Sequence, residues 1–123
     1  MRALIIDDSK AMRSILGRML RGLGFEVVEA VNGRDAIKRL HETEKVELAL
    51  VDWNMPEMSG FEFIRAVRAE HSYDGVLLVM VTTETEMEQV SKALEAGANE
   101  YVMKPFTQEV ILEKLQMLGM TSP

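Results

Sequence analysis

Two kinds of segment alternate along the chain, and they differ in the period of their hydrophobic residues. Short apolar runs rich in β-branched residues predict strands, whereas apolar residues that recur every three or four positions predict amphipathic helices. The predicted strands are Ala3–Ile6, Glu26–Ala30, Leu48–Val51, Val76–Val81 and Glu100–Met103. The predicted helices are Ser9–Leu23, Gly33–Glu42, Gly60–Glu70, Glu84–Ala96 and Thr107–Leu118. Strands and helices therefore alternate five times, in (βα)5 order.

This alternation predicts an α/β fold in which helices cover both faces of one doubly wound, parallel, five-stranded sheet. The first, third and fourth strands are nearly continuous apolar runs, which is typical of strands buried on both faces. In such folds ligands bind beyond the carboxyl ends of the strands, so candidate functional residues are sought there.

Length and composition narrow the class of protein. The 123 residues are 47% hydrophobic and contain no cysteine, which predicts one domain over residues 1–120 with a short tail at 121–123, and excludes thiolate chemistry. The longest apolar run, Val76–Val81, is far shorter than the ~20 residues that cross a membrane, so we expect a cytoplasmic protein without a membrane partner. The net charge of −6 argues against nucleic-acid binding.

Three aspartates follow two of the predicted strands. Asp7 and Asp8 come after the first strand, and Asp52 comes after the third. If these strands are neighbours, the three carboxylates converge and repel one another unless a cation joins them. With oxygen ligands and no histidine or cysteine nearby, Mg²⁺ is the expected ion.

Two further strand ends supply groups of complementary chemistry. Thr82 offers a hydroxyl after the fourth strand, and Lys104 offers an ammonium group after the fifth. A hydroxyl, an ammonium group and a bound Mg²⁺ together suit the oxygens of a phosphoryl group. Asp52 is the candidate nucleophile because it stands alone on its strand, and its product would be an aspartyl phosphate.

These residues form a pattern that is similar to a known family. Nearly the whole chain, residues 1–118, resembles the receiver domain of bacterial response regulators, and most closely the single-domain chemotaxis type. The resemblance rests on Asp7-Asp8, Asp52–Gly60, Thr82-Thr83-Glu84 and Tyr101–Phe106. It implies a flavodoxin-like fold with strand order 2-1-3-4-5.

The resemblance implies a role for each acidic residue. Asp52 would accept a phosphoryl group from a histidine kinase. Asp8, Asp52 and the backbone carbonyl of Asn54 would bind Mg²⁺, and Asp7 would support the ion through water. The protein would be a monomeric signalling switch, not a turnover enzyme, that assists its own phosphorylation and dephosphorylation.

It also implies how the switch operates. Thr82 and Lys104 would contact the phosphoryl oxygens, and the Lys104-Pro105 peptide bond would be cis. Thr82 and Tyr101 would move on phosphorylation and remodel the face made by the fourth helix, the fifth strand and the fifth helix. That face would bind a target protein, such as a component of the flagellar motor switch.

Two features bear on lifetime and partner choice. Asn54 and Glu84 resemble the positions that set how quickly the acyl phosphate hydrolyses. Glu84, Glu86 and Glu88 make the start of the fourth helix acidic, which favours helix formation because carboxylates stabilise a helix N-terminus. The same acids are expected on the output face, where they bear on the choice of target.

Other functions on this fold stay open at this point. Within the receiver class, the chain could be a phosphorelay shuttle or a domain of a larger regulator. A flavodoxin-type electron carrier would need a phosphate-binding loop where Asp7-Asp8 stand, and those acids would repel the phosphate. An aspartyl-phosphate phosphatase would need an Asp-x-Asp pattern after the first strand, where the two aspartates are adjacent instead.

Overall fold

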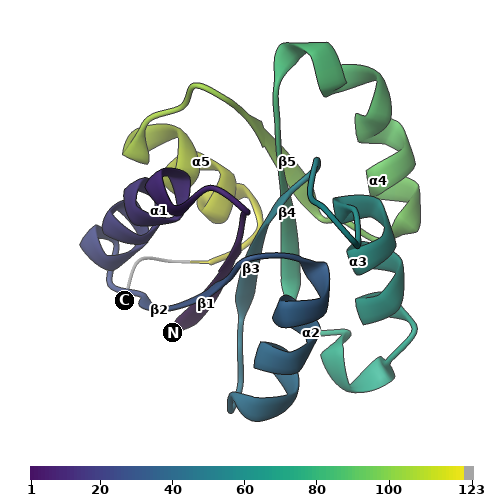
Figure 1. Cartoon of the computed structure of the whole chain (residues 1–123). Helices are drawn as coiled ribbons and strands as arrows, with labels where there is room; N and C mark the ends of the chain where they lie inside the picture. Colours follow the sequence, from purple (N-terminus) through teal and green to yellow (C-terminus); the bar gives the residue numbers. More distant parts are fainter. Residues whose placement is uncertain (121–123) are drawn as a thin grey trace.

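The computed structural model describes residues 1–120, except for the side chains of Glu84 and Thr85. Within that part, one sheet of parallel strands lies between two layers of helices (Figure 1). The strands are β1 (Arg2–Ile6), β2 (Glu26–Ala30), β3 (Leu48–Asp52), β4 (Leu77–Thr82) and β5 (Glu100–Met103). Their order is β2-β1-β3-β4-β5, so the predicted fold class and strand order are confirmed. The predicted tail, residues 121–123, lies outside the described residues.

The helices begin close to their predicted positions, with one exception. They are α1 (Lys10–Gly22), α2 (Gly33–Glu42), α3 (Gly60–Arg68), α4 (Val90–Ala96) and α5 (Gln108–Met117), with 3-10 helices η1 (His71–Tyr73) and η2 (Glu84–Gln89). The single helix predicted over 84–96 is wrong in its first half, which is η2. The backbone N–H of Glu86 bonds to the Thr83 carbonyl three residues back, and this spacing tightens the turn. Among the helices of residues 1–120, none is long and apolar enough to span a membrane.

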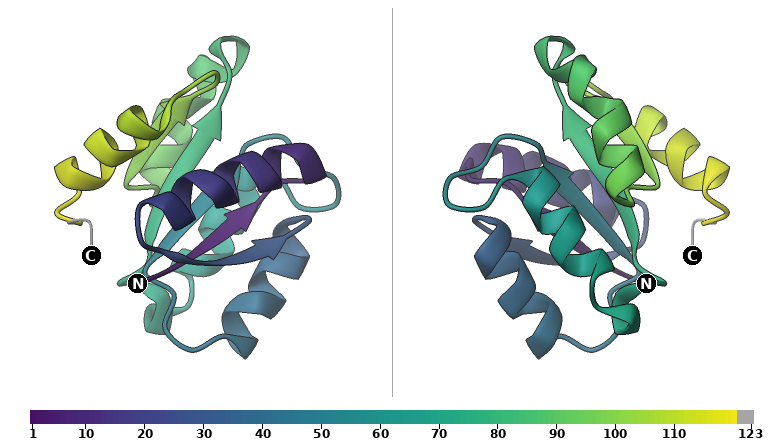
Figure 2. Two further views of the ribbon diagram at one scale, coloured as in Figure 1. Left: turned by 90° about the vertical axis from the view of Figure 1, so that its left-hand side faces the viewer. Right: turned by 90° about the vertical axis from the view of Figure 1, so that its right-hand side faces the viewer.

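Each face of the sheet is covered by its own set of helices. The alternation along β1 sends Ala3 and Ile5 to one face, against α1 and α5, and Leu4 and Ile6 to the other, against α2, α3 and α4. The two views of Figure 2 show these layers on opposite sides of the strands. Because buried side chains pack against both faces of the sheet, the ends of the strands occupy fixed positions.

Polar residues gather where the strands end and the helices begin. Ser9, Asn32, Ser59 and Thr107 each precede a helix, and each side chain accepts a hydrogen bond from a backbone N–H of the first turn. Such caps satisfy donors that a helix leaves unpaired. All helices of a parallel α/β fold start at the same end of the sheet, so this end is the polar one.

Candidate functional site

The three predicted aspartates meet at the carboxyl end of the sheet. β1 and β3 are paired neighbours, with Ile6 opposite Val51, so the residues that follow them lie side by side. Carboxylate oxygens of Asp7, Asp8 and Asp52 all lie within 4.8 Å of one another. Asp7 is 1% exposed and Asp52 8% exposed, whereas Asp8 is open to solvent.

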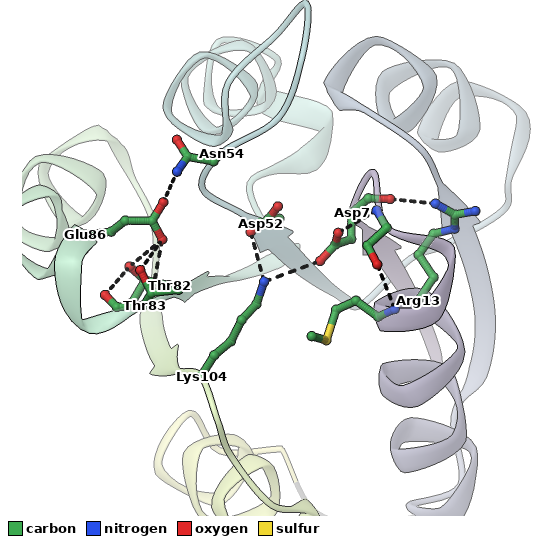
Figure 3. A network of polar contacts seen from close by, with 10 residues as sticks. Asp7, Arg13, Asp52, Asn54, Thr82, Thr83, Glu86 and Lys104 are labelled. Carbon is green, nitrogen blue, oxygen red and sulfur yellow. Dashed lines mark hydrogen bonds and ion pairs between the residues drawn. The ribbon is translucent and has the colours of Figure 1, made fainter.

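Lys104 projects between two of these carboxylates (Figure 3). Its Nζ lies 3.5 Å from Asp52 Oδ1 and 3.7 Å from Asp7 Oδ2. The Lys104 backbone N–H bonds to the Thr82 carbonyl at 2.7 Å, which anchors the end of β5 against β4. The peptide bond between Lys104 and Pro105 is cis, the isomer expected there.

The surroundings make both buried carboxylates more basic than ordinary aspartates. Burial, helped by the charge of Asp7, raises the pKa of Asp52 from 3.8 to about 6, although Lys104 acts in the opposite direction. Burial also raises the pKa of Asp7, while the Ser9 backbone N–H and Lys104 oppose the rise. At neutral pH the ionised form of these buried carboxylates therefore lowers the stability of the fold.

The oxygen set fits a hard divalent cation. Asp7 Oδ2 is buried and accepts no hydrogen bond within the part of the chain that the structure describes, and it lies 3.7 Å from Lys104 Nζ. An orphaned carboxylate oxygen beside two further carboxylates matches the ligands that Mg²⁺ prefers. Asp7, Asp8 and Asp52 could therefore hold a metal ion.

Thr82 and Asn54 belong to a second network on the other side of Asp52, centred on Glu86 (Figure 3). Glu86 Oε1 accepts hydrogen bonds at 3.0 Å from both the backbone N–H and the hydroxyl of Thr83. Its other oxygen accepts from the Asn54 side-chain amide. The wholly buried Thr82 donates its hydroxyl to the Thr83 carbonyl at 3.2 Å and lies 3.5 Å from Glu86 Oε1.

Sequence reasoning missed the position of Glu86. It expects Glu86 on the output face together with Glu88, but the side chain of Glu86 turns toward the site. The signal was present as the spacing of Thr83 and Glu86, which form a capping box. The side chain of Glu84, predicted to tune hydrolysis, lies outside the described residues.

Tyr101, the other predicted switch residue, is not in the acidic cluster. It is partly buried on β5, and Lys114 Nζ lies 4.7 Å from the centre of its ring. Lys114 also pairs with Glu100 at 3.4 Å. Tyr101 therefore lies on the face shared by β5 and α5, with a cation over its ring.

Gly60 is a further residue on which the site depends. A Cβ at this position would lie 2.6 Å from the Asp52 carbonyl oxygen and 3.0 Å from Trp53 Cα. Only glycine allows α3 to begin this close to the end of β3. Gly60 thereby fixes the backbone that carries Asp52.

A separate hollow lies at the opposite end of the sheet. It has a volume of about 320 Å³ and is lined by residues that include Leu40, Val46, Tyr73 and Val76, at the amino ends of β3 and β4. The cluster of Asp7, Asp8 and Asp52 does not line this hollow. Chemistry, not volume, locates the candidate site at the carboxyl end of the sheet.

Comparison with known proteins agrees with this geometry. A family model described as the response regulator receiver domain matches residues 3–116. The chain belongs to this family. The receiver domain is 45% identical over 117 residues to a chemotaxis protein CheY homolog of Campylobacter jejuni, a match that covers 94% of this chain and 90% of that protein. It is 40% identical over 119 residues to the chemotaxis protein CheY1 of Helicobacter pylori, covering 96% of each.

Solved structures support the same assignment. The receiver domain resembles the chemotaxis response regulator CheY4 of Vibrio cholerae with a TM-score of 0.87 and 35% identity, over 95% of this chain and 97% of that one. The chain is thus a receiver domain of a CheY-type response regulator in two-component signalling. This membership decides against the flavodoxin-type carrier and the phosphatase considered on the same fold.

Proposed function

We propose that Asp52 accepts a phosphoryl group from a histidine kinase and that this modification switches the protein between two binding states. The observation that carries the proposal is the meeting of Asp52 with Asp7, Asp8 and Lys104 at one point, although these residues come from three separate segments of the sequence. Family membership supports the proposal, because receiver domains are phosphoacceptors.

The chemistry is a transfer between two nucleophiles. A carboxylate oxygen of Asp52 attacks phosphorus, the bond from phosphorus to the kinase imidazole nitrogen breaks, and the imidazole retains that electron pair. With a pKa of about 6, Asp52 is mostly ionised at neutral pH yet more basic than an ordinary aspartate, and both properties favour attack. Lys104, 3.5 Å away, would pair with a phosphoryl oxygen, and the Thr82 hydroxyl would donate to another.

Mg²⁺ would be held by Asp8, Asp52 and the backbone carbonyl of Asn54, with Asp7 acting through water. When bound, the ion would neutralise the charge that the carboxylates and the phosphoryl group share. Asp7 Oδ2, which accepts no hydrogen bond in the described chain, has a free lone pair for such a water. The side chains carry out the other roles: Asp52 attacks phosphorus, and Lys104 and Thr82 bind the phosphoryl oxygens.

The output is proposed to be the face of α4, β5 and α5. Leu94 on α4, Met103 on β5 and Met117 on α5 are exposed apolar side chains, and Met117 is 70% exposed. Methionine is one of the residue types enriched at protein–protein interfaces, and two of these three side chains are methionines. Tyr101 lies on the same strand as Met103, two residues before it, so a change at this residue would reach the face directly. Because these relatives are named as chemotaxis proteins, we propose a component of the flagellar motor switch as the target.

The test is phosphorylation by acetyl phosphate with Mg²⁺, followed by intact-mass measurement. We expect the wild-type protein to gain one phosphoryl group, and Asp52→Asn to gain none because it lacks the nucleophilic oxygen. Asp74→Asn is the matched control, since Asp74 is an exposed aspartate that pairs with His71 outside the site. Full phosphorylation of Asp52→Asn would refute the proposal, as would a failure of the wild-type protein to respond.

A further inference from the structure

Glu86 joins two loops that flank Asp52. Asn54 belongs to the loop after β3, and Thr82 and Thr83 end β4, so the Glu86 carboxylate bridges segments more than 25 residues apart in the sequence. Glu86 pairs with no lysine or arginine among the described ion pairs. Its negative charge is instead distributed over amide and hydroxyl donors beside the phosphorylation site.

Those donors are the groups that an added phosphoryl group would need. The Thr82 hydroxyl is wholly buried, and it already donates to the Thr83 carbonyl with Glu86 Oε1 3.5 Å away. A phosphoryl oxygen on Asp52 is also an anionic acceptor, so it competes with Glu86 for the same proton. Two anions near one donor repel each other, and in a partly buried site water screens that repulsion less than at the surface.

We propose that Glu86 is a positioning residue that holds the unphosphorylated arrangement and opposes phosphorylation. Its carboxylate keeps the Asn54 amide and the Thr82–Thr83 turn in place, and it must leave them before the Thr82 hydroxyl can turn toward a phosphoryl oxygen. Removal of its charge therefore makes the phosphorylated state easier to reach. This inference rests on the proposed phosphorylation of Asp52.

The test is the binding of beryllofluoride, which mimics a phosphoryl group on a carboxylate, at saturating Mg²⁺ with Trp53 fluorescence as the signal. Trp53 follows Asp52 directly and its ring lies 6.1 Å from that of Phe61, so it reports locally. Glu86→Gln keeps the length of the side chain and removes the charge. We expect it to bind beryllofluoride about fivefold more tightly or better, the size of a typical coupling between two states.

Glu88→Gln is the matched control, because Glu88 is an exposed acid of the same 3-10 helix and, among the described hydrogen bonds and ion pairs, it makes none to Asn54 or Thr82. It should bind like the wild-type protein. Glu86→Ala should also bind more tightly, whereas a merely structural role for Glu86 would weaken binding in both variants. For acetyl phosphate, the initial phosphorylation rate should rise in Glu86→Gln at a constant phosphodonor concentration.

The outcomes separate the two proposals. If the wild-type protein binds beryllofluoride, Asp52→Asn does not, and Glu86→Gln binds equally or less tightly than wild type, the role of Glu86 is refuted while the proposed function stands. If the wild-type protein does not bind beryllofluoride at all, the proposed function itself fails. Tighter binding by both Glu86→Gln and Glu88→Gln would assign the effect to net charge and overturn the specific role of Glu86.

Discussion

Replacing Asp52 by asparagine should stabilise the protein at neutral pH when Mg²⁺ is absent. Asp52 is 8% exposed, and burial together with the charge of Asp7 raises its pKa to about 6. The ionised carboxylate that a nucleophile requires is therefore a cost to the fold. Asparagine has nearly the same shape and carries no charge, so the variant avoids this cost.

The magnitude follows from linkage between protonation and folding. The rise from 3.8 to about 6 corresponds to about 3 kcal/mol, at roughly 1.4 kcal/mol for each pKa unit. Because the native pKa is above the unfolded one, the native state binds more protons between these values, and the free energy of unfolding falls as the pH rises through this window. The asparagine amide must also be desolvated, so the expected gain at neutral pH is about 1–3 kcal/mol.

The assay is urea unfolding of both proteins in EDTA at a series of pH values, followed by far-ultraviolet circular dichroism. The variant should be more stable than wild type above roughly pH 7. The difference should shrink as the pH falls and approach zero only near pH 3, below the pKa of 3.8, where Asp52 is protonated in both states. Added Mg²⁺ should stabilise wild type more than the variant, because the ion binds the ionised carboxylates of the native state. Asp74→Asn, a change of an exposed aspartate outside the site, is the control variant in the same assay.

Equal stability of wild type and Asp52→Asn at neutral pH would refute the reasoning. A difference that stayed constant from pH 8 to about pH 4 would refute it equally, because a constant difference cannot come from titration of this carboxyl group. A destabilised variant at all pH values would mean that Asp52 contributes more through its contact with Lys104 than burial removes. That contact measures 3.5 Å between Nζ and Oδ1.

Two further predictions concern how the site is supported. Gly60→Ala should lose about 1–3 kcal/mol of stability in urea unfolding and bind Mg²⁺ more weakly in titration calorimetry, since its Cβ would lie 2.6 Å from the Asp52 carbonyl oxygen. Gly75→Ala, whose Cβ would meet nothing within 4 Å, should keep its stability and its Mg²⁺ affinity, and equal behaviour of the two variants would contradict the packing argument. Arg68→Met should lower the free energy of unfolding in urea by about 3 kcal/mol, because Arg68 donates hydrogen bonds at 2.8–3.0 Å to backbone carbonyls in the segments before β4 and β5. Arg65→Met, which changes an exposed arginine over an aromatic ring, should alter that free energy little, and an equally small effect of Arg68→Met would show that water replaces the lost hydrogen bonds.

Most of the fold could be predicted because it depends on local patterns. Three of the strands are nearly continuous apolar runs, and each strand boundary was predicted to within one residue, as for Leu48–Val51 against Leu48–Asp52. The start of the fourth helix could not be predicted in this way. An acidic segment satisfies the rules for an α-helix and a 3-10 helix alike, and the hydrogen bonds between Thr83 and Glu86 decide between them.

The candidate site was predictable in its members but not in their arrangement. Asp7, Asp52 and Lys104 follow strands, and parallel pairing brings strand ends together, so their meeting follows from the topology. The contrast between buried Asp7 and exposed Asp8 depends on the turn after β1, where the Ser9 backbone N–H bonds to Asp7 Oδ1. The contact of Glu86 with Asn54 joins two loops, and no local pattern encodes it.

The position of β5 has a consequence for the folding chain. β5 has four residues, pairs with β4 alone and brings Lys104 to Asp52 across 52 positions of sequence. The chain must lose the entropy of closing a large loop to make this contact, so we expect it to form late in folding. In a partly folded molecule in which β5 is not yet paired, Asp7 and Asp52 lack their contact with Lys104. Under the proposed function, such a molecule would accept a phosphoryl group from the kinase only slowly. Only fully folded molecules would therefore carry the signal.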